Sequence, residues 1–170
     1  HIQYMAAVFI ETRRVDVVFA QDAMQSGFSS AVSVFFWRKK LVMRIAGDYA
    51  WEQGVQRFGV QDLLDDFLKK SYGFRVEILR WFERLAAKRA QSIIVPSRYL
   101  QAVVTSWGVD SSRVHVVYNA MLVAPEKTTK QDVRERLGLE GFTFLSVGRL
   151  VPWKGFSMLI RLMPEIRLRI

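Results

Sequence analysis

Strand-like and helix-like segments alternate along almost the whole chain, and this alternation constrains the fold more than any other feature. Short apolar runs rich in β-branched residues predict buried strands at 15–19, 41–46, 92–95, 114–118, 142–147 and 166–170. Apolar residues at three- and four-residue spacing predict helices at 2–9, 28–36, 60–68, 74–89, 98–107 and 156–163. The segment 47–59, with three glycines, is expected to be irregular. Such alternation predicts an α/β fold, a Rossmann-like parallel sheet with helices on both faces.

The polarity of the chain predicts its division into domains. Residues 1–122 are interpreted as part of a first Rossmann-like domain, and the polar segment 123–140 as an inter-domain linker with a short helix near Val133 and Leu137. Residues 141–170 are interpreted as the start of a second Rossmann-like domain. One strand, one helix and one strand lack enough partners to bury their faces, so we expect this second domain to be truncated.

Composition narrows the classes of partner. The absence of cysteine excludes disulfides and thiolate metal sites, and a reducing cytoplasm is the simplest compartment. The net charge of +9 favours anionic partners. The longest apolar stretch ends at Arg38, far short of the roughly 20 residues needed to span a bilayer. We therefore expect a cytoplasmic protein, with peripheral contact at the inner face of the membrane as an open alternative.

The loop from Gly148 to Gly155 is the strongest candidate for chemistry. It joins a predicted strand to a predicted helix, and parallel sheets bind ligands at such loops, beyond the carboxyl ends of the strands. Arg149 and Lys154 place two cations beside the free N–H groups of a helix start, which suits a diphosphate. The spacing matches neither a P-loop nor a dinucleotide-binding glycine turn. Solvated basic residues with a packing role for Trp153 are the structural alternative.

Two longer segments point to a family. The residues 144–156 read Phe-Leu-Ser-Val-Gly-Arg-Leu-Val-Pro-Trp-Lys-Gly-Phe, and the residues 93–100 read Ile-Ile-Val-Pro-Ser-Arg-Tyr-Leu. The latter are followed by Trp-Gly-Val at 107–109 and by 114–120, with weaker matches at 19–22 and 47–52. In this order and spacing, the segments resemble retaining family-4 glycosyltransferases of GT-B fold. The likeness covers nearly the whole chain.

The resemblance implies a function and a donor site. Such an enzyme transfers a hexose from a nucleotide-diphosphate-sugar to an acceptor with retention of configuration, and needs neither metal nor other cofactor. Arg149 and Lys154, with Gly148 and Gly155, would hold the diphosphate of the donor. The family's glycine-rich loop and its paired glutamates are expected outside these 170 residues, so we expect the chain alone to have negligible transferase activity.

The acceptor side is carried over less directly. Many family members have a histidine near the loop that holds Gly47, Asp48 and Tyr49, and this sequence has Asp48 instead. Asp48 is a candidate catalytic or sugar-orienting group, with helix capping as an equal alternative. Gly47, Tyr49, Gln21 and Asp22 are candidates for the acceptor side of the cleft. Arg57 is interpreted as a partner of Glu52.

Several partners remain open from the sequence. The acceptor is expected to be a carbohydrate or a lipid-linked sugar. The basic runs 38–40 and 69–70 are compatible with contact to an anionic membrane. The alternative to a transferase is a basic module without catalysis that binds membranes or nucleic acid. Basic residues are dispersed and no RNA-recognition or helix-turn-helix motif is present, so nucleic acid is not an expected partner.

Overall fold

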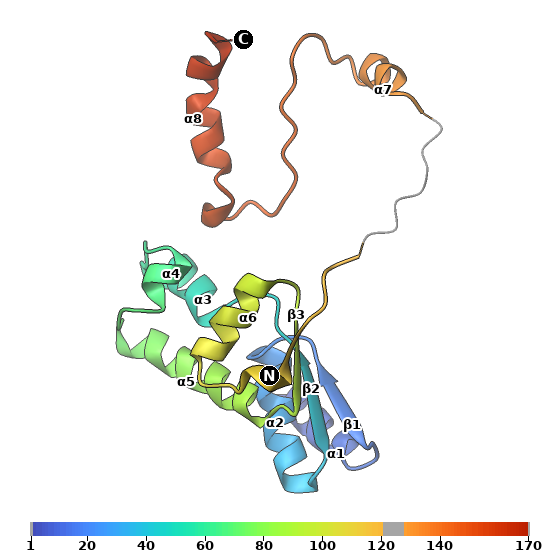
Figure 1. Cartoon of the computed structure of the whole chain (residues 1–170), viewed down its shortest axis with the longest axis vertical. Helices are drawn as coiled ribbons and strands as arrows, with labels where there is room; N and C mark the ends of the chain where they lie inside the picture. Colours follow the sequence, from blue (N-terminus) through green and yellow to red (C-terminus); the bar gives the residue numbers. More distant parts are fainter. Residues whose placement is uncertain (1, 121–127, 170) are drawn as a thin grey trace. The chain divides into compact units, whose positions relative to one another are not determined.

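The computed structural model describes residues 2–120 and 128–169 and separates into two units, His1–Ala120 and Met121–Ile170 (Figure 1). Each unit is described by itself. Among the described residues, no helix has both the length and the apolar character needed to cross a bilayer.

A four-stranded sheet forms the centre of the first unit. The strands are β1 (Val17–Ala20), β2 (Lys40–Arg44), β3 (Ser92–Val95) and β4 (Val114–Val116), in the order β1-β2-β3-β4. All neighbouring pairs are parallel, with Phe19 opposite Val42 and Ile93 opposite both Met43 and Val114. The predicted parallel α/β sheet is confirmed. Because all strands run the same way, their carboxyl ends meet at one edge.

The described residues of the first unit also form six α-helices. They are α1 (Ile2–Thr12), α2 (Gln25–Trp37), α3 (Tyr49–Arg57), α4 (Leu64–Phe67), α5 (Phe74–Arg89) and α6 (Arg98–Ser106), and a 3-10 turn, η1 (Ser111–Arg113), precedes β4. Helix α2 packs against α1 and α5, α3 packs against α5, and α6 packs against β3 and β4. In Figure 1, α3 and α4 lie on the side of the unit where β2 ends.

The hydrophobic core is divided into two clusters. The larger one lies on the sheet and includes Leu41, Met43, Ile93 and Val95, all fully buried. The smaller one joins α3, α4 and α5 and consists of the buried residues Ala50, Val60, Phe67 and Val76. The smaller cluster therefore holds the helices that follow β2, away from the sheet.

The segment 47–68 differs from its sequence prediction. We expected residues 47–59 to be irregular, but α3 occupies most of this stretch because Asp48 caps its first turn. We expected a helix over 60–68, but only the single turn of α4 forms. Gly59 adopts a φ of 71° and the Val60 N–H donates to the carbonyl of Gly54. The chain therefore turns at Gly59, and the first residues of the expected helix are not helical.

Over its described residues, 128–169, the regular elements of the second unit are all helical. These are α7 (Lys130–Arg136), which begins with a capping box between Thr129 and Asp132, the 3-10 turn η2 (Pro152–Lys154), and α8 (Phe156–Arg167). The predicted strand at 142–147 is wrong, because the described residues of this unit offer no neighbouring strand to accept its hydrogen bonds. The predicted strand at 166–170 is also wrong over its described residues: α8 continues through Pro164 to Arg167, and Ile170 lies outside the described residues. The proposed second Rossmann-like domain stays a prediction.

Candidate functional site

The candidate residue Asp22, just past the carboxyl end of β1, holds the start of α2. Its carboxylate accepts hydrogen bonds from the N–H groups of Met24, Gln25 and Ser26 and from the hydroxyl of Ser26. Charged acceptors are favourable at a helix N-terminus, where several N–H groups lack partners. Both oxygens are therefore engaged within the unit, while Gln21 beside it is exposed. Contact of this pair with an acceptor stays a prediction.

Asp48, at the carboxyl end of β2, is the N-cap of α3. Its Oδ1 accepts from the N–H of Trp51 at 2.7 Å, and the residue is only 2% exposed. The structural alternative raised for this residue, a helix cap, is thus observed. A role of Asp48 in orienting a sugar stays a prediction.

Glu83, which the sequence analysis did not select, completes this helix start. It lies on α5, is 2% exposed, and accepts from the N–H of Tyr49 at 2.9 Å and from that of Ala50 at 3.2 Å. Its carboxyl group also lies close enough to that of Asp48 for the two charges to interact. Two acidic side chains separated by 35 positions in the sequence therefore share one buried site beside the loop after β2.

Burial raises the pKa values of both carboxyl groups. Burial is the main cause that raises the pKa of Asp48, and the bond from Trp51 and the charges of Arg80 and Arg84 oppose it. Burial and the neighbouring Asp48 raise the pKa of Glu83 well above its ordinary value. Two ionised carboxylates in a buried contact repel each other, so the pair retains a proton above the ordinary carboxyl range.

This retained proton predicts a dependence of stability on pH. Because the pKa of Glu83 is higher in the folded chain than its ordinary 4.5, the stabilisation is complete below that value and is lost as the pH rises through the folded pKa. In that window the free energy of unfolding should fall by up to about 1.4 kcal/mol per pH unit. Urea unfolding at a series of pH values checks this.

The variant Glu83→Gln isolates the contribution of this residue, because its amide does not titrate. Its free energy of unfolding should fall less steeply above pH 4.5 than that of the wild type. Asp62, Asp110 and Asp132 have lowered pKa values, so their contributions are lost only as the pH falls and lie outside this window. Parallel curves for the two proteins above pH 4.5 would contradict the shared proton.

Other groups at this edge of the sheet are placed by the same strand ends. Gly47 lies close to the side chain of Glu52, since an added Cβ would lie 3.1 Å from Oε1 of Glu52. Tyr49 is half-buried. Arg44, at the end of β2, reaches across β3 and donates to Oδ1 of Asn119 at 2.8 Å. The edge thus brings Gly47, Asp48 and Tyr49 together, and adds Arg44 and Glu83 to them.

The candidate donor loop in the second unit is compact. A Cβ added to Gly148 would lie 3.4 Å from Cζ of Phe156 and 4.0 Å from Cδ of Lys154, so the loop folds back on itself. The N–H of Val151 donates to the carbonyl of Arg149, and that of Lys154 to the carbonyl of Val151. Gly155, with a φ of 71°, ends η2 and begins α8 without a side-chain cap.

The two cations of this loop are available for a ligand. Arg149 and Lys154 are both exposed, and within the described part of the chain their side chains form no ion pair or hydrogen bond. The loop therefore presents uncompensated positive charge just before a helix of 12 residues. Among residues 2–120 and 128–169, no group of three acidic, histidine or cysteine residues is arranged to hold a metal ion.

Comparison with protein families assigns the first unit. Residues 1–120 match the glycosyl transferase 4-like domain. The chain belongs to this family. The match covers the sheet, both hydrophobic clusters and the Asp48–Glu83 pair. No curated protein matches the chain.

Solved structures support the same fold. Three crystal structures of HepE from Anabaena, in complex with UDP, with UDP-glucose, and with UDP and glucose, are 21%, 22% and 21% identical to this chain, with TM-scores of 0.64, 0.66 and 0.67. They align with 96%, 95% and 96% of the chain. The chain spans 40% of the length of each of these structures. The expected α/β fold is confirmed for one Rossmann-like domain of a GT-B glycosyltransferase.

Proposed function

We propose that this chain is part of an enzyme that transfers a hexose from a nucleotide-diphosphate-sugar to a carbohydrate or lipid-linked acceptor. The observation that carries the proposal is a family domain followed by a compact loop with two unpaired cations at a helix start. HepE structures of the same fold contain UDP or UDP-glucose, which supports a nucleotide-sugar as the donor.

The loop has the chemistry that the reaction requires. When the glycosidic bond breaks, negative charge accumulates on the departing diphosphate. Arg149 and Lys154 would attract that charge more strongly as it develops, which lowers the barrier. The positive end of the α8 dipole acts in the same direction. Because Arg149 and Lys154 can neutralise the leaving group, the proposal includes no metal or further cofactor.

The stereochemistry is a finer part of the proposal. Retention of configuration is carried over from the resemblance to retaining family-4 enzymes. The Asp48–Glu83 pair fits a supporting role in either outcome, since it fixes the backbone of the loop after β2 where an acceptor would lie.

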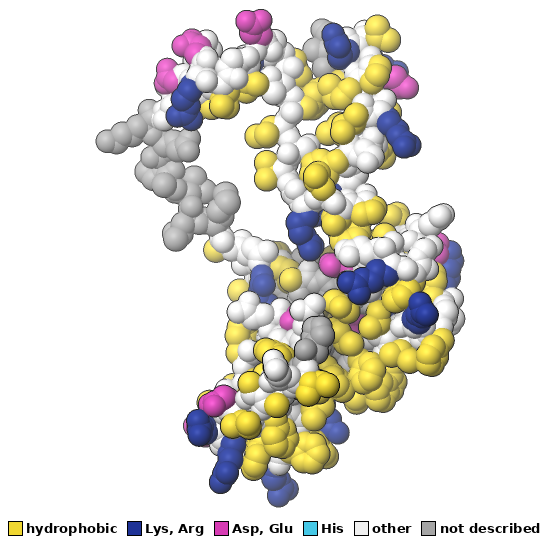
Figure 2. Space-filling model, turned by 180° about the vertical axis from the view of Figure 1, so that it is seen from behind, with side chains coloured by type: hydrophobic (Ala, Val, Ile, Leu, Met, Phe, Trp, Pro, Cys, Tyr) yellow, Lys and Arg dark blue, Asp and Glu magenta, His cyan; other side chains and the backbone are white. Residues whose placement is uncertain are grey.

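Contact with a membrane is a further part of the proposal. Figure 2 shows hydrophobic and basic side chains together on the surface of the molecule. Exposed aromatic residues on α2 and α5, among them Phe36 and Trp81, give the mixed character that favours an anionic lipid surface. The basic runs offer less uncompensated positive charge to a membrane than the sequence indicated, because Lys39, Lys69 and Lys70 each lie near an aspartate.

Removing either loop cation should weaken donor binding. In Arg149→Ala and in Lys154→Ala we expect the affinity for UDP-glucose to fall about 10- to 150-fold, the usual range for one charged hydrogen bond. The measurement is a titration followed by the amide NMR signals of residues 148–155. Arg136→Ala removes an exposed cation of the same unit and should leave the affinity unchanged. Unaltered binding in both loop variants would count against the proposed function.

A further inference from the structure

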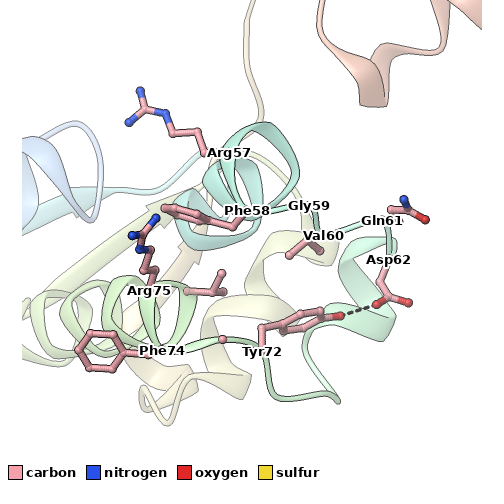
Figure 3. Close-up of a pocket in the computed structure, with 11 residues that line it drawn as sticks. Arg57, Phe58, Gly59, Val60, Gln61, Asp62, Tyr72, Phe74 and Arg75 are labelled. Carbon is pink, nitrogen blue, oxygen red and sulfur yellow. Dashed lines mark hydrogen bonds between the residues drawn. The ribbon is translucent and has the colours of Figure 1, made fainter.

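An open pocket of about 770 Å³ lies in the first unit between the end of α3, the following loop and the start of α5 (Figure 3). Its volume falls within the range of about 300–1,000 Å³ that small-molecule sites occupy. In the view of Figure 3, Arg57, Phe58 and Arg75 lie at one end of the pocket, and Asp62 and Tyr72 lie at the other. None of these residues was selected from the sequence as part of a site.

The charge of the pocket is positive. Asp62 is already neutralised, because Lys70 donates to its Oδ1 at 2.6 Å and the Tyr72 hydroxyl donates to its Oδ2 at 2.7 Å. Arg57 and Arg75 are exposed and form no ion pair or hydrogen bond among the described residues, so the expected pairing of Arg57 with Glu52 is wrong. Two guanidinium groups that line the pocket are therefore left without a partner among the described residues.

The contrast with Arg80 shows that this is not a general property of the region. Arg80 donates to Oε1 of Glu77 and to the carbonyls of Lys70 and Phe67, and its guanidinium lies 3.8 Å from the ring of Phe67. All of its contacts hold the fold together. Arg57 and Arg75 on the neighbouring surface make no such ion pair or hydrogen bond with the described residues.

Aromatic side chains give the same pocket a second kind of contact. Phe58 and Phe74 line it and are 36% and 77% exposed, so both side chains are accessible to a ligand. Aromatic rings pack well against the apolar faces of sugars, and guanidinium groups bind carboxylates and phosphates through paired hydrogen bonds. Together, these groups suit a saccharide that carries a negative charge.

Helix α3 connects this pocket to the loop of Asp48. It begins directly after Asp48 and ends at Arg57, at the edge of the pocket. With nine residues, at about 1.5 Å per residue, the helix is about 14 Å long. An extended acceptor can therefore reach from the loop after β2, where its reacting hydroxyl would lie, to the two arginines.

We propose that this pocket binds an acidic group on the acceptor saccharide, a carboxylate or a phosphate ester, through Arg57 and Arg75. The inference rests on the proposed function, since it names the chemical class of the acceptor. The pocket thereby selects acidic over neutral acceptors, at a distance from the reacting hydroxyl.

Three matched disaccharides test the selection on the 170-residue chain. These are cellobiose, its uronic acid counterpart and cellobiose 6′-phosphate, and binding is followed by the amide NMR signals of residues 57–62 and 72–76. Both acidic sugars should bind at least about tenfold more tightly than cellobiose, as expected for one or more charged hydrogen bonds. The carboxylate and phosphate arms show which acid is preferred. Equal binding of all three sugars overturns the proposal.

Charge-removing variants separate the pocket from the overall charge of the chain. The double variant Arg57→Gln, Arg75→Gln should lose the preference for acidic sugars and keep its affinity for cellobiose. Arg14→Gln, which removes an exposed cation near the end of α1, should keep the preference. An equal loss in Arg14→Gln, or inorganic phosphate binding as tightly as cellobiose 6′-phosphate, overturns a specific saccharide site.

The outcome is distinguishable from failure of the proposed function. Affinity for UDP-glucose depends on Arg149 and Lys154 and should be unchanged in the double pocket variant. If UDP-glucose binds through the donor loop but acidic sugars are not preferred, only the pocket proposal fails. If acidic sugars bind at Arg57 and Arg75 but the donor loop does not bind UDP-glucose, the pocket is a saccharide site and the transferase assignment fails.

Discussion

The variant Glu83→Ala should lower the free energy of unfolding by about 3–5 kcal/mol, in the range seen when a buried polar network loses one member. The change leaves the N–H groups of Tyr49 and Ala50 without their acceptor in a buried site, and it leaves Asp48 without its acidic partner. A buried donor that loses its partner retains its desolvation penalty. Urea unfolding followed by tryptophan fluorescence gives the value.

Two variants show whether the loss comes from the hydrogen bonds. Glu83→Gln keeps the length of the side chain and one acceptor oxygen, so it should lose much less stability than alanine. Glu11→Ala removes an exposed acid on α1, paired with Arg14 at 3.3 Å, and should change stability by less than about 1 kcal/mol. Equal losses for alanine and glutamine at position 83 would indicate that the bonds to α3 contribute little.

The role of Glu83 on α5 was not predicted from the sequence, although the bounds of that helix were. Periodicity predicted the bounds of α5 at 74–89, and the structure has Phe74–Arg89. The apolar residues at three- and four-residue spacing, Ile78, Phe82 and Leu85, are only half-buried. The buried residues are Val76, Arg80, Glu83, Ala86 and Ala87. Val76, Arg80, Glu83 and Ala87 follow one another at spacings of four, three and four residues, so they share one face of the helix. This spacing is the sequence signal that places two charged residues on the buried face.

Local patterns predicted best where each element needs no distant partner. The helix predicted at 98–107 is observed at Arg98–Ser106, and it begins after Ser97, whose hydroxyl accepts from the N–H of Leu100. The parallel sheet followed from short apolar runs that alternate with helices. In contrast, the run at 142–147 has the composition of a strand, but a strand forms only where a neighbour supplies hydrogen bonds, and composition does not report that neighbour.

The candidate sites divide in the same way. Asp22 and Asp48 both follow strand ends. Asp48 is the N-cap of α3, and Asp22 accepts from the N–H groups where α2 begins. The Arg57 and Arg75 pocket was not found, because its residues come from two helices joined by a loop whose path depends on the smaller hydrophobic cluster. That cluster therefore determines whether the pocket exists.

Replacing Phe67, the centre of the smaller cluster, with alanine should cost about 3–5 kcal/mol. The side chain is fully buried, stacks on Tyr72 with ring centres 4.8 Å apart, and lies beneath the guanidinium of Arg80. Truncation leaves a cavity and removes the ring on which Arg80 rests. Because folded domains are stable by only about 5–15 kcal/mol, the loss should be visible as a large shift in urea unfolding.

The position of Phe67 predicts that its replacement destabilises some parts of the first unit more than others. The larger cluster on the sheet does not include it, so hydrogen exchange should accelerate most in residues 49–76 and least in β2 and β3. Phe74→Ala, at a 77% exposed position, should change stability by less than about 0.5 kcal/mol. If exchange instead accelerated equally throughout the first unit, the two clusters would unfold as one. The pocket would then depend on the sheet as much as on the helices that line it.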